Sequence, residues 1–194
     1  MRQAAVERNT NETNVRVSLA IDGAGKTDIN TGVGFLDHML ALFAAHGQFD
    51  LSVFCKGDLY VDCHHSVEDV GIALGQALLQ AAGDKRGIAR YGNITLPMDE
   101  ALVSVCLDFS GRPYLVYNVD LPSPSVGNFD TETVEDFFRA VAVNAGLTLH
   151  INMVYGKNTH HIIEACFKAF GRTLSAALKV DPEIKGVPST KGML

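Results

Sequence analysis

Two short segments of this chain carry side chains that could hold a metal ion. They share the pattern His-His-x-x-Glu, as His64, His65 and Glu68 in one segment and His160, His161 and Glu164 in the other. On a helix, residues four positions apart share a face, whereas adjacent residues diverge by about 100°. His64 and Glu68 would therefore reach one ion, and His65 would point elsewhere. Imidazole and carboxylate without thiolate favour Mn²⁺ or Fe²⁺ over a four-coordinate structural zinc.

A structural explanation competes with the metal site for each segment. One His-His pair alone equally fits two exposed histidines at the start of a helix. Two pairs followed by the same glutamate, in a chain with only seven histidines, favour metal binding. His38, His46 and Glu12, each taken alone, fit polar residues on a helix flank or before a strand.

Cations near these segments indicate an anionic ligand. Lys168 lies one helical turn beyond Glu164, which would place a positive charge beside a bound metal ion. Like charges repel at that distance unless an anion such as a phosphate lies between them. Arg90, Arg112 and Lys191 fit ordinary surface cations equally well, although Arg112 lies in a Gly-Arg-Pro turn.

An internal duplication carries both metal-binding segments. Residues 64–78 (HHSVEDVGIALGQAL) align without a gap on residues 160–174 (HHIIEACFKAFGRTL). Upstream, residues 36–53 align on residues 134–151. Two copies indicate a duplicated domain rather than a solenoid, which needs more repeats to bury its core.

The order of elements predicts an α+β fold. Apolar periodicity predicts the following elements: helices from near residues 34 and 131, and strands at 15–21, 102–109 and 114–119. Each half would then read helix, strand, loop, His-His helix. We expect two pseudo-symmetric halves, residues 1–90 and 91–194, each a small β-sheet with two helices. The helices would pack together between the sheets.

The composition excludes several classes of protein. With 194 residues, 47% of them apolar and 20% charged, the chain fits one large globular domain or two small ones that share a core. A net charge of −6 argues against a general nucleic-acid binder. Apolar runs are too short for a membrane span or a signal peptide, so we expect a cytoplasmic protein. Four scattered cysteines predict reduced, mostly buried thiols: Cys55, Cys63, Cys106 and Cys166.

Six motifs along essentially the whole chain carry a resemblance to a known family. They are Arg8-Asn-Thr-Asn-Glu-Thr, Gly-Phe-Leu-Asp-His-Met (34–39), His-His-Ser-Val-Glu-Asp (64–69), Ser-Gly-Arg-Pro-Tyr (110–114), Asn-Thr-His-His-Ile-Ile-Glu-Ala (158–165) and Pro-Ser-Thr-Lys-Gly-Met-Leu (188–194). In combination they closely resemble the imidazoleglycerol-phosphate dehydratases. The resemblance implies a lyase of histidine biosynthesis with two Mn²⁺ ions per active site. It also implies a homo-oligomeric shell of twenty-four subunits, with the sites at subunit interfaces.

The resemblance implies one set of metal ligands. They are His38, His64, His65, Glu68, Asp136, His160, His161 and Glu164. Asp136 is a departure, because the family commonly has a histidine in a Glu-His-Phe-Phe setting where this chain reads Glu-Asp-Phe-Phe. A carboxylate also binds Mn²⁺, so we keep Asp136 as an expected ligand. Asp62-Cys63 stands where similar proteins often have Asp-Asp, which should alter only a contact behind the ligands.

The resemblance also implies a substrate site and a reaction. The implied substrate contacts are Glu12, His46, Arg90, Arg112, Lys168, Ser189, Thr190 and Lys191. The implied reaction dehydrates D-erythro-imidazole glycerol phosphate to imidazole acetol phosphate and water. Two Mn²⁺ ions would bind the ring as imidazolate, Glu12 would act as the catalytic base, and the cations would hold the phosphate.

Two other functions remain open at this point. A dinuclear phosphohydrolase would use the metals to direct water at the phosphate, which would then lie close to the metals. A metal-storing shell without catalysis would explain the histidines but would give no role to Glu12, Arg112 or Lys191.

Overall fold

Two four-stranded sheets form the outer layers of the structure, a computed structural model that describes residues 2–192 and 194. The first has the order β1-β2-β4-β3 and comprises β1 (Gln3–Asn9), β2 (Thr13–Ala20), β4 (Asp50–Gly57) and β3 (Thr27–Asn30). The second has the order β5-β6-β10-β7 and comprises β5 (Tyr91–Met98), β6 (Ala101–Asp108), β10 (Thr148–Tyr155) and β7 (Tyr114–Asn118). In both sheets the first three strands are antiparallel, and the fourth runs parallel to its neighbour. The two sheets thus share one topology, in agreement with the duplication.

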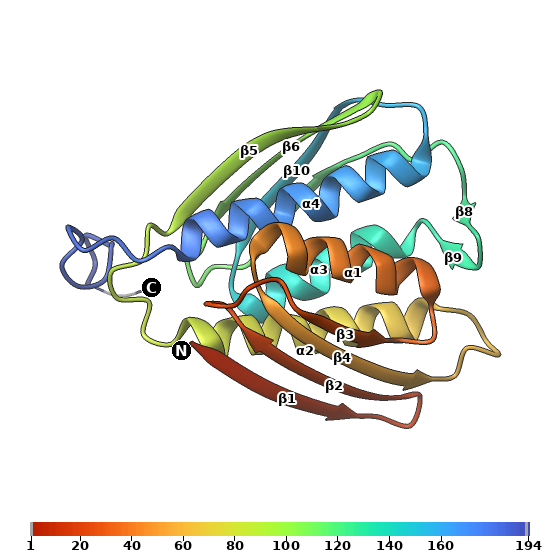
Figure 1. Ribbon diagram of the computed structural model, residues 1–194, viewed down its shortest axis with the longest axis horizontal. Coiled ribbons are helices and arrows are strands. Elements are labelled where there is room, and N and C mark those ends of the chain that lie inside the picture. Colours follow the sequence, from red (N-terminus) through yellow and green to blue (C-terminus); the bar gives the residue numbers. More distant parts are fainter. Residues whose placement is uncertain (1, 193) are drawn as a thin grey trace.

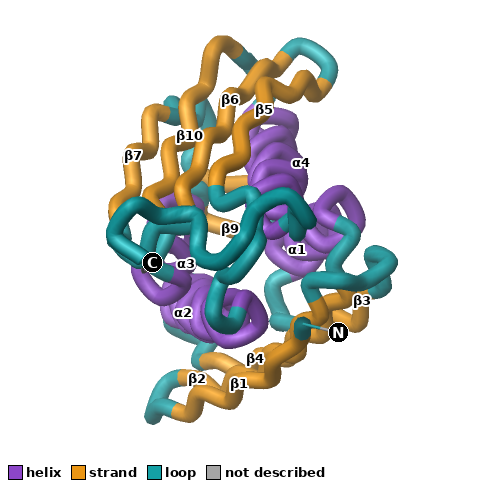
Figure 2. Tube along the Cα trace, turned by 90° about the vertical axis from the view of Figure 1, so that its left-hand side faces the viewer, coloured by secondary structure: helices purple, strands orange, loops and turns teal. Residues whose placement is uncertain are grey.

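Four helices of the described chain lie between the sheets (Figure 1 and Figure 2). They are α1 (Gly34–Gly47), α2 (His64–Ala82), α3 (Thr133–Ala145) and α4 (Thr159–Leu178). All four run in the same direction, so their N-terminal ends lie at one end of the molecule and the C-terminal tail lies at the other (Figure 1). A short hairpin of β8 (Ser125–Val126) and β9 (Phe129–Asp130) precedes α3. The predicted α+β fold, with its helices between two sheets, is confirmed.

The helices pair across the duplication. α1 packs against α4, and α2 packs against α3, so each helix of one half contacts a helix of the other. Glycines allow these close approaches: a Cβ atom at Gly171 would lie 2.4 Å from Phe43 O, and one at Gly75 would lie 2.8 Å from Val141 O. Any larger residue at either position would push the paired helices apart.

Apolar side chains from both sheets and all four helices form one core. Alternation along β2 buries Val15, Val17 and Leu19 on the face towards the helices. Aromatic rings fill the space between the helices, and the Phe138 and Phe167 centroids lie 4.9 Å apart. Burying such a side chain contributes roughly 1.5–3 kcal/mol relative to leaving it exposed.

Membrane-spanning helices and cysteines are two further features that the structure allows us to compare with the sequence. In the ranges that the structure describes, no helix combines the length and apolar character needed to cross a membrane. All four cysteines are free thiols, and three of them are buried while Cys106 is exposed. The prediction of unpaired, mostly buried cysteines is therefore confirmed.

Candidate metal centre

Three of the predicted ligands converge where the N-terminal ends of α1 and α4 meet. His160 Nε2 lies 3.2 Å from Glu164 Oε2, and His38 Nε2 lies 3.7 Å from the same oxygen. One ligand atom from each residue lies within 4.8 Å of the other two, and no other triad in residues 2–192 and 194 meets this spacing. These imidazole and carboxylate donors need only small side-chain movements to meet on one divalent ion. We call these three residues the first cluster.

Lys168 keeps the carboxylate of the first cluster ionised. Its Nζ donates a hydrogen bond to Glu164 Oε1 at 2.5 Å, one turn along α4. Burial alone would raise the pKa of Glu164, but the Lys168 hydrogen bond and charge, with smaller effects of His38 and His160, bring this pKa below its ordinary value. An ionised carboxylate is the form that binds metal, so Lys168 prepares Glu164 for that role.

His46, near the C-terminal end of α1, is influenced by the charges of Lys168 and Arg172 on α4. Burial lowers the pKa of His46, and the charges of Lys168 and Arg172 lower it further. Both effects favour the neutral form of the imidazole. Two of the predicted substrate contacts, His46 and Lys168, are therefore close enough for the lysine charge to act on the imidazole, and Lys168 also bonds Glu164 of the first cluster.

A second cluster lies where α2 meets α3. His64 Nε2 lies 4.0 Å from Glu68 Oε2, and His64 Nδ1 lies 3.9 Å from Asp136 Oδ2. Asp136 thus has the position in α3 that His38 has in α1, as the alignment of residues 36–53 with 134–151 predicts. The donors are further apart than in the first cluster, and they are one imidazole and two carboxylates instead of two imidazoles and one carboxylate.

Each cluster combines the two halves of the duplication. The first draws on α1 from the first half and α4 from the second, and the second draws on α3 and α2 in the same crossed way. The crossed pairing of helices is therefore what brings the predicted ligands together.

The second histidine of each His-His pair points away from its cluster and is held by a carboxylate. His65 Nδ1 lies 3.0 Å from Asp58 Oδ2, and His161 Nδ1 lies 2.7 Å from Glu100 Oε2. These hydrogen bonds raise the pKa of both histidines above the ordinary value. A bond at Nδ1 fixes the ring and directs Nε2 outward, which is the usual arrangement behind a metal-binding histidine.

The two carboxylates that orient these histidines were not predicted from the sequence. Asp58 follows β4, and Glu100 lies in the turn between β5 and β6. The hydrogen bond with His161, followed by those from the backbone N–H groups of Asn158 and Lys157, lowers the pKa of Glu100 to about 2. Acidic residues are common in loops, so neither position carried a signal in the sequence alone.

Glu12 lies in the loop between β1 and β2, beside one of the outward histidines. Its Oε1 lies 3.8 Å from His65 Nε2, and its side chain is 54% exposed. The structure therefore brings the predicted base to the outward-facing His65.

The two arginines predicted to contact substrate lie together near Asp108. Arg90 donates from Nε to Asp108 Oδ1 at 2.6 Å and from Nη2 to Asp108 Oδ2 at 3.0 Å. Its Nη1 also donates to Pro188 O at 2.8 Å, which ties the tail to this place. Arg112 has a side chain that is 65% exposed, with Nη2 3.7 Å from Asp108 Oδ2. Arg90 therefore holds the tail, whereas Arg112 is accessible to a ligand.

The tail and the arginines lie far from the clusters. Ser189, Thr190 and Lys191 follow Pro188, and the Lys191 N–H donates to Ser189 Oγ at 3.2 Å. The Arg90 N–H donates to Ala177 O, near the C-terminal end of α4, whereas His160 lies at its N-terminal end. At the helical rise of 1.5 Å per residue, Ala177 and His160 are about 26 Å apart. Most of the predicted site residues therefore form two groups, one near each end of α4, which spans the length of the molecule (Figure 1).

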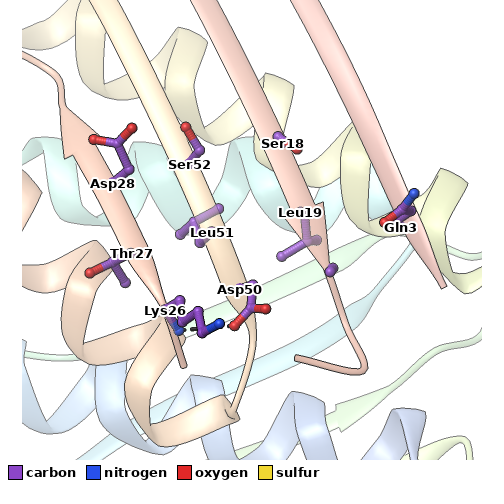
Figure 3. Close-up of a pocket in the computed structure, with 10 residues that line it drawn as sticks. Gln3, Ser18, Leu19, Lys26, Thr27, Asp28, Asp50, Leu51 and Ser52 are labelled. Atoms are coloured by element: carbon purple, nitrogen blue, oxygen red, sulfur yellow. Dashed lines mark hydrogen bonds between the residues drawn. The ribbon is translucent and has the colours of Figure 1, made fainter. Parts of the chain in front are cut away.

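A surface hollow of about 380 Å³ on the first sheet is separate from both groups. It is lined by Gln3, Ser18, Leu19, Ala20, Lys26, Thr27, Asp28, Asp50, Leu51 and Ser52 (Figure 3). Asp50 accepts hydrogen bonds from the backbone N–H groups of Ala24 and Lys26, which lower its pKa. The carboxylate therefore serves the chain turn beside it, and the hollow carries no predicted ligand.

Comparison with known proteins decides which family this arrangement belongs to. A family model described as imidazoleglycerol-phosphate dehydratase matches residues 31–174. The imidazoleglycerol-phosphate dehydratase of Caldanaerobacter subterraneus subsp. tengcongensis is 62% identical over 194 residues, which is 100% of both chains. The chain belongs to the imidazoleglycerol-phosphate dehydratase family. A second relative, from Acetivibrio thermocellus, is 62% identical over 193 residues, covering 100% of this chain and 99% of the relative.

Solved structures agree with this membership. The imidazoleglycerol-phosphate dehydratase of Staphylococcus aureus matches with a TM-score of 0.84 and 47% identity, covering 92% of this chain and 99% of that chain. The enzyme of Pyrococcus furiosus matches with a TM-score of 0.84 and 36% identity, covering 97% of this chain and 100% of that chain. The predicted family, and with it the predicted class of enzyme, a hydro-lyase, are confirmed.

Proposed function

We propose that this chain converts imidazole glycerol phosphate to imidazole acetol phosphate and water, a step of histidine biosynthesis. The first cluster supports the proposal most directly. It presents two imidazoles and one ionised carboxylate, in a chain that matches a dehydratase along its whole length. The four thiols are unpaired, which fits a cytoplasmic enzyme.

The residues of the two clusters fit Mn²⁺. Nitrogen and carboxylate oxygen donors suit this ion, and three ligands leave coordination positions open for substrate. When bound there, two such ions would hold the substrate ring as imidazolate, and the charge of this ring would help to expel the hydroxyl group from the neighbouring carbon. We propose His38, His160 and Glu164 as ligands of one ion and His64, Glu68 and Asp136 as ligands of the other. His65 and His161 would add their outward Nε2 atoms at subunit contacts.

Glu12 is the proposed proton acceptor. Dehydration removes a hydrogen from one carbon and a hydroxyl group from its neighbour, and the resulting enol becomes the ketone. The substrate has no carbonyl to acidify that hydrogen, so the ring must act as the electron sink, and a base must reach the hydrogen two carbons from the ring. Glu12 lies 3.8 Å from the ring nitrogen of His65. Its carboxylate is exposed enough to meet a substrate.

Arg112, Lys168 and Lys191 are the proposed partners of the phosphate. Arg112 offers an exposed planar group that suits a phosphate, and the two lysines add point charges. Arg90 would act differently, because its donors already bond Asp108 and Pro188 O. It would keep the tail, with Ser189 and Thr190, closed over the bound phosphate.

We further propose that each active site is built from several chains. The clusters and the Arg112 end lie about 26 Å apart along α4, whereas the substrate is one ring, three carbons and a phosphate. One chain therefore cannot supply both groups to one substrate molecule. Closed point-group assembly would bring opposite ends of different chains together, as in the proposed shell of twenty-four subunits.

The experiment that tests the proposed function identifies the product. Purified chain loaded with Mn²⁺ is incubated with imidazole glycerol phosphate, and the mixture is followed by NMR of carbon-bound protons and of phosphorus. We expect imidazole acetol phosphate, with loss of turnover in Glu12→Gln at unchanged metal content. Release of inorganic phosphate would instead indicate a phosphohydrolase. An unchanged substrate would indicate a metal-storing shell.

A further inference from the structure

Asp69 lies one residue beyond Glu68 on α2 and faces the first sheet rather than the second cluster. The helix α2 packs against β1 and β2 (Figure 2). Asp69 is four positions from His65 on this helix, so the two residues share one face of it. Only 7% of the Asp69 side chain is exposed. A buried carboxylate is costly unless it is paired, so its partners show what it does.

Two residues from β1 and β2 satisfy the Asp69 carboxylate. Arg8 donates from Nε to Asp69 Oδ1 at 2.7 Å, and Thr13 donates its hydroxyl to Asp69 Oδ2 in a short hydrogen bond. Arg8 and Thr13 flank the loop that connects β1 to β2. Both ends of this loop are therefore fixed to the helix that carries His65.

The loop between these anchors carries Glu12. Thr10 Oγ1 accepts hydrogen bonds from the N–H of Glu12 at 3.2 Å and from the N–H of Thr13 at 3.0 Å. The Thr10 N–H donates to Thr13 O at 2.9 Å, which closes the turn. The exposed Glu12 side chain is little restrained by packing, so the position of its carboxylate depends on this backbone.

The second half of the chain serves as an internal control. Its β5–β6 hairpin carries Glu100 at the position of Glu12, and this carboxylate is fixed directly, by His161 Nδ1 and by the backbone N–H groups of Lys157 and Asn158. In this half Ala165 follows Glu164 where Asp69 follows Glu68. The shared register places Leu96 and Ala101 at the positions of Arg8 and Thr13. All three residues are apolar and buried.

Comparing the two halves distinguishes a role of Asp69 in positioning the Glu12 loop from a role in stabilising the fold. An equivalent helix packs on the same kind of hairpin in both halves, and apolar residues suffice where the carboxylate in the turn is fixed by its own hydrogen bonds. A buried ion pair seldom stabilises a fold more than apolar residues of similar size. We propose that Asp69, acting through Arg8 and Thr13, is a positioning residue that fixes the Glu12 loop beside His65. This inference rests on the proposed function, because it assigns the loop to the same reaction.

The test compares variants of the network with a matched control in the Mn²⁺-loaded protein. Asp69→Asn removes the charged acceptor, Thr13→Val removes the hydroxyl, and Thr13→Ser restores it. Asp22→Asn is the control, because Arg2 and Asp22 form a similar pair at the opposite end of the same two strands. The measurements are kcat, KM, metal content, particle mass and hydrogen exchange of the amides of residues 10–13 without substrate.

We expect kcat to fall on the order of 100-fold in Asp69→Asn and at least about 10-fold in Thr13→Val, because small displacements of a reacting group have effects of this size. KM, metal content and particle mass should change little, and the amides of residues 10–13 should exchange faster. Thr13→Ser and Asp22→Asn should match the parent protein.

Three outcomes would overturn the inference: unchanged kcat in both disruptive variants, a fall of kcat only in proportion to lost metal, or equal effects of Thr13→Val and Thr13→Ser. If Asp69→Asn fails to fold, the two Thr13 variants decide the matter, because they keep the Arg8–Asp69 pair. If the parent protein does not dehydrate the substrate, the proposed function fails. Hydrogen exchange of the loop still tests the positioning role in that case.

Discussion

Asp136 has, in the second cluster, the position that His38 has in the first, although its side chain is a carboxylate. A divalent ion such as Mn²⁺ accepts either donor. We expect Asp136→Ala to lose about one of two bound ions per chain, because one cluster loses a ligand while the other is intact. Asp136→His should keep both. Metal analysis after dialysis checks this, and two ions retained in Asp136→Ala would remove Asp136 from the ligand set.

The shifted pKa values of Glu100 and His161 predict how the stability of the metal-free chain depends on pH. The folded-state pKa of Glu100 is about 2, below its ordinary value of 4.5, so its contribution is present above pH 4.5 and is lost as the pH falls towards 2. The pKa of His161 is raised above 6.5, so its contribution is present below that pH and is lost as the pH rises through the raised value. The pair should therefore stabilise the fold most between these limits.

Thermal unfolding of Glu100→Gln checks this pH window. The Tm difference from the parent protein should be largest near pH 5.5 and should shrink at pH 9 and near pH 2.5. Asp99→Asn is the matched control, because Asp99 Oδ2 lies 3.8 Å from the same histidine but its side chain is 71% exposed. A Tm difference that is independent of pH would mean that only the backbone hydrogen bonds of Glu100 matter.

At the scale of elements, the start of α4 sets the direction of both its histidines. Asn158 Oδ1 accepts hydrogen bonds from the N–H groups of His160 at 2.9 Å and His161 at 3.4 Å. Asn158→Ala should lower the free energy of unfolding by about 1 kcal/mol and should weaken metal binding, because the first turn frays. Asn158→Ser keeps an acceptor and should lie close to the parent. Denaturant unfolding and metal titration measure the two effects, and equal results for both variants would contradict the role of this cap.

The helices and loops also show which parts of the site could be predicted from the sequence and which could not. The repeat of His-His-x-x-Glu predicted both ligand helices, because helical spacing alone places His160 and Glu164 on one face. It could not predict that His38 of the first half would join them, because that contact depends on the pairing of α1 with α4. Gly171, which permits this approach, resembles any other glycine in a sequence. Asp58 and Glu100 were missed for a related reason, since their partners are distant in sequence.

At the scale of the whole molecule, the arrangement separates two kinds of chemistry. The proposed metal ligands and Glu12 gather near the N-terminal ends of the helices, and Arg90, Arg112 and the tail gather towards the opposite end of the molecule (Figure 1). The sequence predicted the members of both groups through the family resemblance. Their separation in one chain became visible only in three dimensions, and it is the strongest argument that the working enzyme is an oligomer.

Hybrid oligomers test the central claim, that one site combines opposite ends of different chains. Glu12→Gln chains and Arg112→Ala chains are dissociated with chelator, mixed in equal amounts, and reassembled with Mn²⁺. Formation of imidazole acetol phosphate is then measured at a substrate concentration far below KM. Each parent variant should be nearly inactive, and the hybrid should recover about a quarter of the parent activity, because random mixing leaves that share of sites with both residues intact. Activity no higher than the average of the two variants would contradict the account, since Glu12 and Arg112 would then serve a site within one chain.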